Sequence, residues 1–305
     1  MVLSIIAVVL LIAVGVSAVI RRRTAANAVM LFAFLLLAGL ELFDRLALQP
    51  SAGFAVYRRI SLWLESLLPA AFLLQSVAYR RNDPFGTLPR TRLGLMAALS
   101  LFPPAMLLIG GSDLSYSPDF LSDRVLFLGN AGFWYYTGLM ASFIVSLANI
   151  EATLAATHGR DRNRVKFEAF GIMILLAVLV FYYSQGILHR TVDMNLVPVR
   201  SSVVIIAALL IGYSQAFRES GARVSVSRHV LYRSITLLAV GVYLIGLGLF
   251  GEGMQYFGVS FGTYLTVVLA FAGGVLLLAV LFSEKVRRRT KVYISKHFYS
   301  HKHDY

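Results

Sequence analysis

Nine long apolar runs are the feature that most limits what this chain can fold into. A helix needs roughly 20 mostly apolar residues to cross about 30 Å of hydrocarbon. The runs cover residues 3–20, 28–46, 60–79, 93–109, 125–148, 167–188, 197–217, 231–250 and 258–282. They lack the alternating ten-residue pattern of outer-membrane strands. We therefore expect an all-α fold, a polytopic membrane bundle of nine transmembrane helices.

The overall composition agrees with a membrane environment. Hydrophobic residues make up 58% of the chain and charged residues 14%, with a mean hydropathy of +0.74. This is more apolar surface than a water-soluble core can bury. The sequence contains no cysteine, which excludes disulfides, thiolate catalysis and cysteine-ligated metals.

The distribution of basic residues predicts an orientation. The net charge is +13, and most basic residues lie in segments 21–23, 80–92, 160–166, 218–233 and after residue 284. By the positive-inside rule these segments are cytoplasmic, which places the N-terminus outside and the C-terminus inside. We expect a multi-pass protein of the bacterial cytoplasmic (inner) membrane. Its basic inner face suits anionic membrane lipids, and we expect no nucleic acid partner.

Polar side chains fall on single faces of several runs, towards the outer half of the membrane in this orientation. At helical spacing these are Arg58, Glu65 and Ser76; Asn130, Trp134 and Thr137; Tyr182, Gln185 and His189; and Glu41, Asp44 and Arg45 at the end of the second run. We predict a polar ligand or sensor pocket opening to the outer face. Its candidate residues are Glu41, Arg45, Arg58, Glu65, Asn130, Trp134, Tyr182, Gln185 and His189.

Glu65 is the most informative member of this set. A charged carboxylate near the bilayer centre costs about 2.5–3.5 kcal/mol on insertion scales, so Glu65 needs a partner, water or a proton. We expect Arg45 or Arg58 to pair with it. The alternative is an ion-paired structural network with snorkelling side chains and an aromatic interface belt.

The sequence shows no catalytic motif and no complete metal site. P-loop, H-E-x-x-H, G-x-S-x-G and Gly-rich ATP-binding patterns are missing, so we expect no catalytic residue and no cofactor in this chain. His297 and His301 have a spacing that can bind zinc or nickel, but a solvated segment explains them better. Gly258 and Gly262 form a GxxxG step that suits either a homodimer face or internal packing.

The last fifteen residues, KVYISKHFYSHKHDY, follow a basic exit from the membrane. This segment resembles the juxtamembrane region of the PrsK sensor histidine kinases of the PEP-CTERM/exosortase system. The specific part of the resemblance consists of Ser295, Lys296, His297, Phe298, Asp304 and Tyr305. In that family a multi-helix membrane region precedes this segment, and cytoplasmic GAF-like and ATPase domains follow it.

The resemblance implies a division of this chain into two parts. Residues 1–284 would be a transmembrane sensor domain, and residues 285–305 a cytoplasmic signal-relay segment that leads to a kinase core absent from this chain. The core would use ATP and Mg²⁺ and act on a response regulator, with a link to exosortase and exopolysaccharide regulation. Nothing here matches the catalytic regions of the family, so no catalytic residue is assigned.

A multi-pass transporter or channel for a small solute is the second interpretation. Broken helices and intramembrane polar residues also mark substrate pathways. A conducting path should place polar residues at both depths of the membrane, whereas the charged residues of the predicted pocket gather in the outer half.

Overall fold

The computed structural model describes residues 2–21, 23–49, 53–79, 90–118, 120–156 and 159–217. The chain divides into two compact units, Met1–Ser234 and Ile235–Tyr305, and all the described residues belong to the first. The predicted spans at 231–250 and 258–282 lie outside the described residues. The same holds for the relay segment 285–305, including Ser295 to Phe298, Asp304 and Tyr305.

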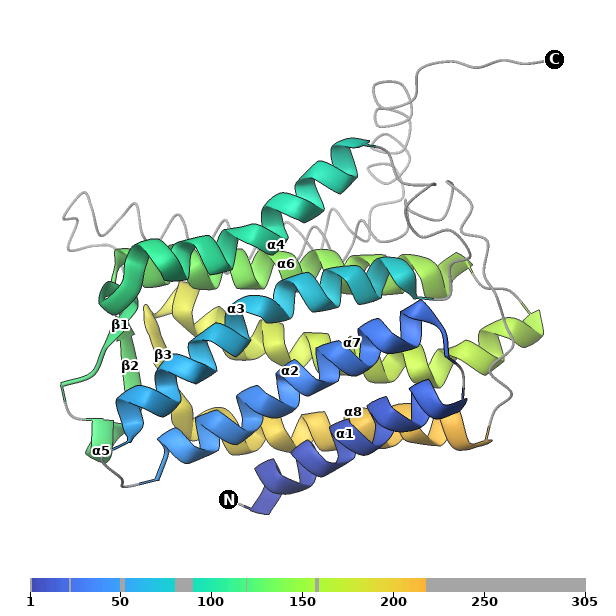
Figure 1. The fold of residues 1–305 in the computed structure, drawn as a ribbon, viewed down its shortest axis with the longest axis horizontal. Helices are drawn as coiled ribbons and strands as arrows, with labels where there is room; N and C mark the ends of the chain where they lie inside the picture. Colours follow the sequence, from blue (N-terminus) through green and yellow to red (C-terminus); the bar gives the residue numbers. More distant parts are fainter. Residues whose placement is uncertain are drawn as a thin grey trace, which may run out of the picture. The chain divides into compact units, whose positions relative to one another are not determined.

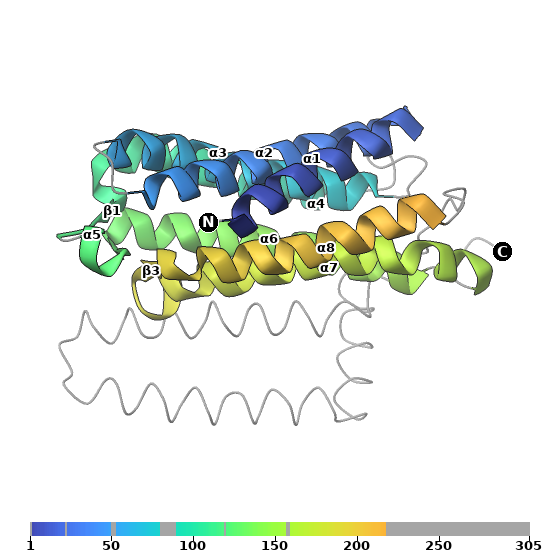
Figure 2. The ribbon, with the colours of Figure 1, turned by 90° about the horizontal axis from the view of Figure 1, so that it is seen from below.

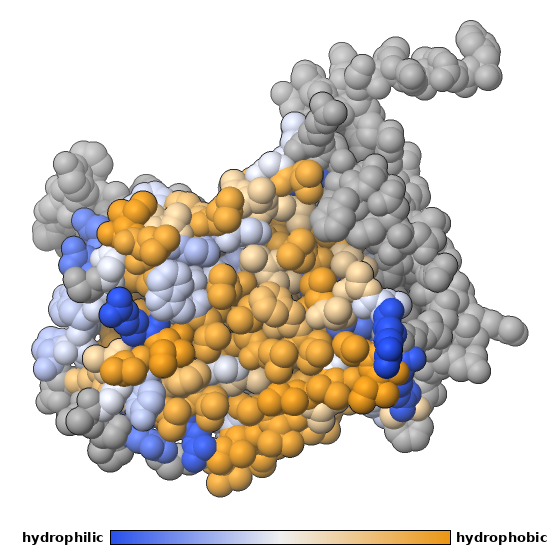
Figure 3. Space-filling model, in the orientation of Figure 1, coloured by the Kyte–Doolittle hydropathy of each residue, from blue (hydrophilic) through white to orange (hydrophobic). Residues whose placement is uncertain are grey.

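Seven long helices build the first unit (Figure 1). They are α1 Val2–Arg21, α2 Ala25–Ala47, α3 Phe54–Ala78, α4 Arg90–Gly110, α6 Asn130–Ala156, α7 Gly159–Leu188 and α8 Val197–Phe217. Each is long and apolar enough to cross a membrane. Figure 3 shows apolar residues along the helices and hydrophilic residues gathered towards their ends. The chain is a multi-pass α-helical membrane protein.

A small antiparallel sheet closes one end of this unit. Its strands are β1 Ser115–Tyr116, β2 Val125–Leu128 and β3 Thr191–Asp193, in the order β1-β2-β3. Residue Ser115 pairs with Leu128, and Val125 pairs with Asp193. Short elements accompany the strands: η1 Gly111–Leu114, α5 Phe120–Asp123 and η2 Met194–Leu196. We call this side of the unit the sheet end.

The strand β2 corrects one predicted span. The fifth apolar run was expected to be helical from residue 125, but residues 125–128 form the central strand and α6 begins at Asn130. A short run of Val, Leu and Phe fits a strand as well as a helix, and periodicity cannot separate the two. Pairing with β1 and β3 decides in favour of the strand.

Six of the helices form a closed ring. Following the contacts, α1 packs on α2, α2 on α3, α3 on α6, α6 on α7, α7 on α8, and α8 on α1. Figure 2 shows α1, α2 and α3 in one row and α6, α7 and α8 in a second row beside it. The helix α4 packs on α3 and α6 outside the ring and is the least buried span. The ring therefore encloses a shared interior to which each of its helices can contribute side chains.

A close approach of α7 to α8 leads to a testable prediction. A Cβ atom at Gly171 would lie 2.5 Å from Ile211 Cγ1 and 2.9 Å from the Ala207 carbonyl oxygen. Because backbone cannot move aside, we expect Gly171→Leu to cost roughly 1–3 kcal/mol through overpacking. Thermal unfolding in detergent should show the loss. Gly94→Leu is the matched control, since nothing lies within 4 Å of that position, and equal midpoints for both variants would contradict the packing.

A buried ion network as the candidate functional site

Two carboxylates on α2 begin the site. Glu41 and Asp44 are three residues apart, so they share the face of α2 that points into the ring. Both are buried, with relative exposures of 0% and 1%. Ionised carboxylates at such positions must be paired and hydrogen-bonded to remain in a folded protein.

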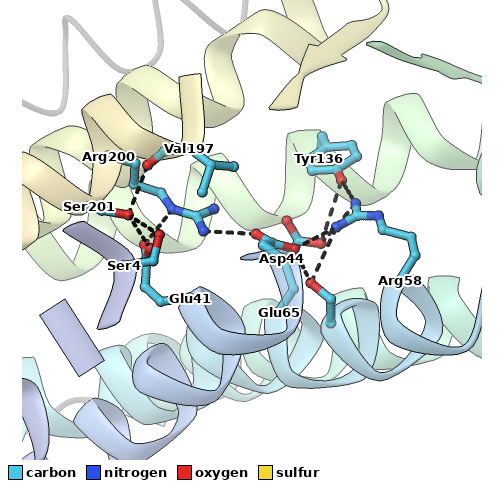
Figure 4. Close-up of polar contacts among 10 residues, drawn as sticks. Ser4, Glu41, Asp44, Arg58, Glu65, Tyr136, Val197, Arg200 and Ser201 are labelled. Carbon is cyan, nitrogen blue, oxygen red and sulfur yellow. Dashed lines mark hydrogen bonds and ion pairs between the residues drawn. The ribbon is translucent and has the colours of Figure 1, made fainter. Parts of the chain in front are cut away.

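Arg200, one turn into α8, bridges these two carboxylates. Its Nε lies 2.7 Å from Glu41 Oε1, and its Nη2 lies 2.8 Å from Asp44 Oδ2 (Figure 4). The planar fork of a guanidinium matches this double contact, which a lysine could not reproduce. The Tyr182 ring on α7 lies 4.7 Å from Arg200 Cζ and adds a cation–π contact.

Arg58 on α3 connects Asp44 to a third carboxylate. Its Nη1 lies 3.3 Å from Asp44 Oδ1, and its Nη2 lies 3.5 Å from Glu65 Oε2. Arg58 Nη2 also donates to the Tyr136 hydroxyl of α6 at 2.7 Å, and Ser61 Oγ donates to Asp44 Oδ1. Three carboxyl groups and two guanidinium groups therefore alternate from one end of the site to the other.

We call this set the ion network: Glu41, Arg200, Asp44, Arg58 and Glu65, with Ser61, Tyr136 and Ser201 bonded to them. Ser201 Oγ lies 2.5 Å from Glu41 Oε2 and 3.1 Å from Ser4 Oγ of α1. With Tyr182 from α7, each ring helix contributes a side chain. The ion network and its bonded neighbours therefore connect all six helices of the ring.

Burial makes this arrangement costly to disturb. Moving charges out of water carries a penalty of several kcal/mol per ion, which pairing offsets only when both partners are present. Removing one partner of a buried pair typically costs 3–5 kcal/mol, because the other charge is left uncompensated. A packing of the helices that leaves one of these groups without its partner is therefore disfavoured.

The candidate residues predicted from the sequence lie in several different places in the structure. Glu41, Arg58 and Glu65 belong to the ion network, and Tyr182 flanks it. Of the two arginines considered for Glu65, Arg58 lies beside it. Arg45 is half-buried and forms no ion pair within the described residues, because Glu41 pairs across the ring with Arg200.

Four other candidates lie nearer the sheet than the network does, or face outward. Asn130 is exposed at the start of α6 and accepts a hydrogen bond from Arg190 Nη1 at 3.2 Å. Trp134 is 47% exposed and points away from the ring interior. His189 is exposed just beyond the end of α7. Gln185 Oε1 accepts from the backbone N–H of Asp193 in β3.

Sequence reasoning missed Arg200, Tyr136 and Ser201. Arg200 lies outside the basic segments from which the orientation was predicted, and tyrosines by their type suit an interface belt. A usable signal did exist. An arginine followed by a serine, one turn inside an apolar run, must satisfy its charge within the bundle or at the interface.

A second polar group lies deeper along α3, away from the sheet end. Asn149 Nδ2 donates to Ser76 Oγ at 3.2 Å, and the adjacent Gln75 is buried without a hydrogen-bond partner for its amide among the described residues. Aromatic rings lie between this group and the ion network: Phe72 packs 6.0 Å from Phe143, which stacks 5.8 Å from Tyr183.

The site is therefore a buried network of ion pairs in a multi-pass helical membrane protein. Within the described ranges, no three His, Cys, Asp or Glu side chains are placed to hold a metal ion. No protein family model, no curated protein sequence and no solved structure matches this chain.

Proposed function

We propose that this chain is the membrane input domain of a sensor histidine kinase. In this proposal the chain has nine spans in a bacterial inner membrane, with the N-terminus and the sheet end outside and residues 285–305 in the cytoplasm. It relays an extracytoplasmic or membrane signal to a kinase core, which uses ATP and Mg²⁺ and acts on a response regulator. The signal is linked to exosortase and exopolysaccharide regulation through the resemblance of the tail.

The observation that carries the proposal is the connection between the sheet and the ion network. Gln185 Oε1 accepts from Asp193 N at 3.2 Å, and its Nε2 donates to the Tyr182 carbonyl at 2.9 Å. Asn195 Nδ2 donates to the Asp123 carbonyl at 3.1 Å. The segment η2 then leads directly into α8, where Arg200 follows within one turn.

This connection provides a route for a signal. A ligand that changes the position of β3 would displace the first turn of α8, and with it the guanidinium between Glu41 and Asp44. Ion pairs are either made or broken, so such a network has discrete arrangements. A ligand shifts the equilibrium between them only if it binds the two arrangements with different affinity.

An activity assay tests the sensor function. Residues 1–305 fused to their native kinase core should autophosphorylate in membranes at a rate different from that of the core alone. Gln185→Ala should move that rate towards the value of the core alone, because it removes the hydrogen bond between the Gln185 side chain on α7 and Asp193 in β3. The control is Ser184→Ala, whose hydroxyl donates to the Phe181 carbonyl of its own helix. Equal rates for the fusion and the isolated core would refute the proposal.

The second candidate is a transporter for a small solute, and the polar group at Gln75 favours it. Polar residues do occur at both depths of the ring, although the aromatic rings of Phe72, Phe143 and Tyr183 lie between them. Proton, sodium and small-solute fluxes into liposomes test this function. Flux that Gln75→Leu abolishes would favour a transporter, and flux no higher than in empty liposomes would count against it.

A further inference from the structure

The charges of the ion network do not balance. Three carboxyl groups, those of Glu41, Asp44 and Glu65, meet two guanidinium groups, those of Arg58 and Arg200. If every group were ionised, the network would carry one uncompensated negative charge. A buried site of low dielectric disfavours such a charge strongly, and the usual outcome is that one group becomes neutral.

Depth makes Glu65 the most costly place for the excess charge. It lies eleven residues after the first residue of α3, which is about 17 Å along the helix axis. This is close to the middle of a hydrocarbon core of about 30 Å. Its relative exposure is 1%. A carboxyl group at such depth needs an ion-pair partner, water or a proton.

Glu65 also has the weakest compensation of the three carboxyls. Glu41 is held by Arg200 at 2.7 Å and by Ser201 at 2.5 Å. Asp44 contacts both arginines and accepts from Ser61. The contacts of Glu65 with Arg58 Nη2 and with the Tyr136 hydroxyl are both long, at 3.5 Å, and that same Nη2 donates to Tyr136 at 2.7 Å.

A further group on α7 faces Glu65. The Tyr183 hydroxyl is fully buried and, among the described residues, is otherwise unpartnered. A phenol hydroxyl can accept a hydrogen bond from a protonated carboxyl group or donate one to an ionised carboxylate, so this contact is compatible with both protonation states of Glu65. The groups around Glu65 from each packed helix are Arg58 on α3, Asp44 on α2, Tyr135 and Tyr136 on α6, Tyr182 and Tyr183 on α7, and Arg200 on α8.

We propose that Glu65 is a proton-binding site and holds a proton at neutral pH, so that the ion network is electrically neutral. The proton is bound covalently to one oxygen of the Glu65 carboxyl group. Loss of this proton would make Glu65 an anion close to the Asp44 carboxylate. The Arg58 guanidinium would then move towards Glu65, and its ion pair with Asp44 would weaken. The inference does not depend on the proposed sensor function.

A metal cation is the other way to balance the charge, and the geometry disfavours it. Hard cations take about six oxygen ligands or more. Within the described residues no three His, Cys, Asp or Glu side chains are grouped to hold a metal, and the groups around Glu65 are mainly phenols and guanidiniums.

Amide substitutions in the full chain, reconstituted in lipid nanodiscs, provide the first test. Glutamine has the shape of a protonated glutamate, so Glu65→Gln should leave the thermal midpoint unchanged within about 2 °C, less than the shift for 1 kcal/mol. Asp44→Asn removes an ionised partner of both arginines and should lower the midpoint by several degrees. A loss in Glu65→Gln as large as in Asp44→Asn, or its failure to fold, would overturn the proposal.

Infrared spectroscopy observes the proton directly. At neutral pH the wild-type protein should show the carbonyl stretch of a buried protonated carboxyl group, shifted in D₂O. This band should be absent in Glu65→Gln and present in Asp113→Asn, whose carboxyl is exposed at the sheet end. A wild-type spectrum without the band, or a band that persists in Glu65→Gln, would contradict the assignment. The thermal midpoint of the wild-type protein should also be measured in sodium and in potassium. A rise with sodium but not with potassium, with no such rise in Glu65→Gln, would mean that a bound cation and not a proton balances the charge.

Discussion

Replacing Arg200 with alanine is expected to cause the largest loss of stability of any single substitution in the described bundle. The guanidinium is 1% exposed and pairs with both Glu41 and Asp44. Its removal leaves two carboxylates buried without their main cation. Breaking a buried pair costs about 3–5 kcal/mol, which corresponds to a fall on the order of 10 °C in the thermal midpoint. Thermal unfolding in detergent or nanodiscs measures this fall.

Two further variants separate the charge effect from a general packing defect. Ser202→Ala is a nearby control, because the Ser202 hydroxyl bonds the Pro198 carbonyl of its own helix. It should leave the midpoint nearly unchanged. The double variant Arg200→Met with Glu41→Gln should recover part of the loss, since it removes one of the unpaired charges together with the arginine. If Arg200→Ala were as stable as Ser202→Ala, the ion network would not contribute to the fold.

Arg58→Ala is expected to be the second most damaging change, with a loss of about 3 kcal/mol. Arg58 is 6% exposed and contacts Asp44, Glu65 and Tyr136. The effect should be smaller than for Arg200, because Asp44 retains its contact with Arg200. A neutral Glu65 reduces the loss further, since it leaves no second anion behind.

The chain offers an adjacent matched control for Arg58. Arg59 is the next residue on α3, has the same side chain and is exposed. Exposed substitutions away from special contacts usually change stability by no more than about 0.5 kcal/mol, so Arg59→Ala should unfold like the wild type. Similar losses for the two alanine variants would mean that the ion pairs of Arg58 carry little energy.

The residues of the predicted pocket divide between an ion-paired interior network and an exposed belt, which are the two parts of the structural alternative to a ligand pocket. Glu41, Arg58 and Glu65 lie in a bonded interior network. Trp134 and Asn130 are exposed, as residues of an interface belt would be, and Arg190 bonds Asn130 there. A shared helical face was therefore sufficient to group Arg58 with Glu65. It failed for α6, where the neighbouring Tyr136 points inward and Trp134 does not.

Seven membrane-length helices among the described residues could be predicted from hydropathy alone, because spanning propensity is a sum of local transfer free energies over about 20 residues. The sequence also grouped Arg58 with Glu65 on one helical face and indicated that Glu65 needs a partner, water or a proton. The identity of the ion-pair partners depends on how the helices pack in three dimensions. Arg200 lies 159 residues from Glu41, and the two meet because α8 returns to the ring beside α1 and α2. Ion pairing depends on distance in space, which hydropathy along the chain does not encode.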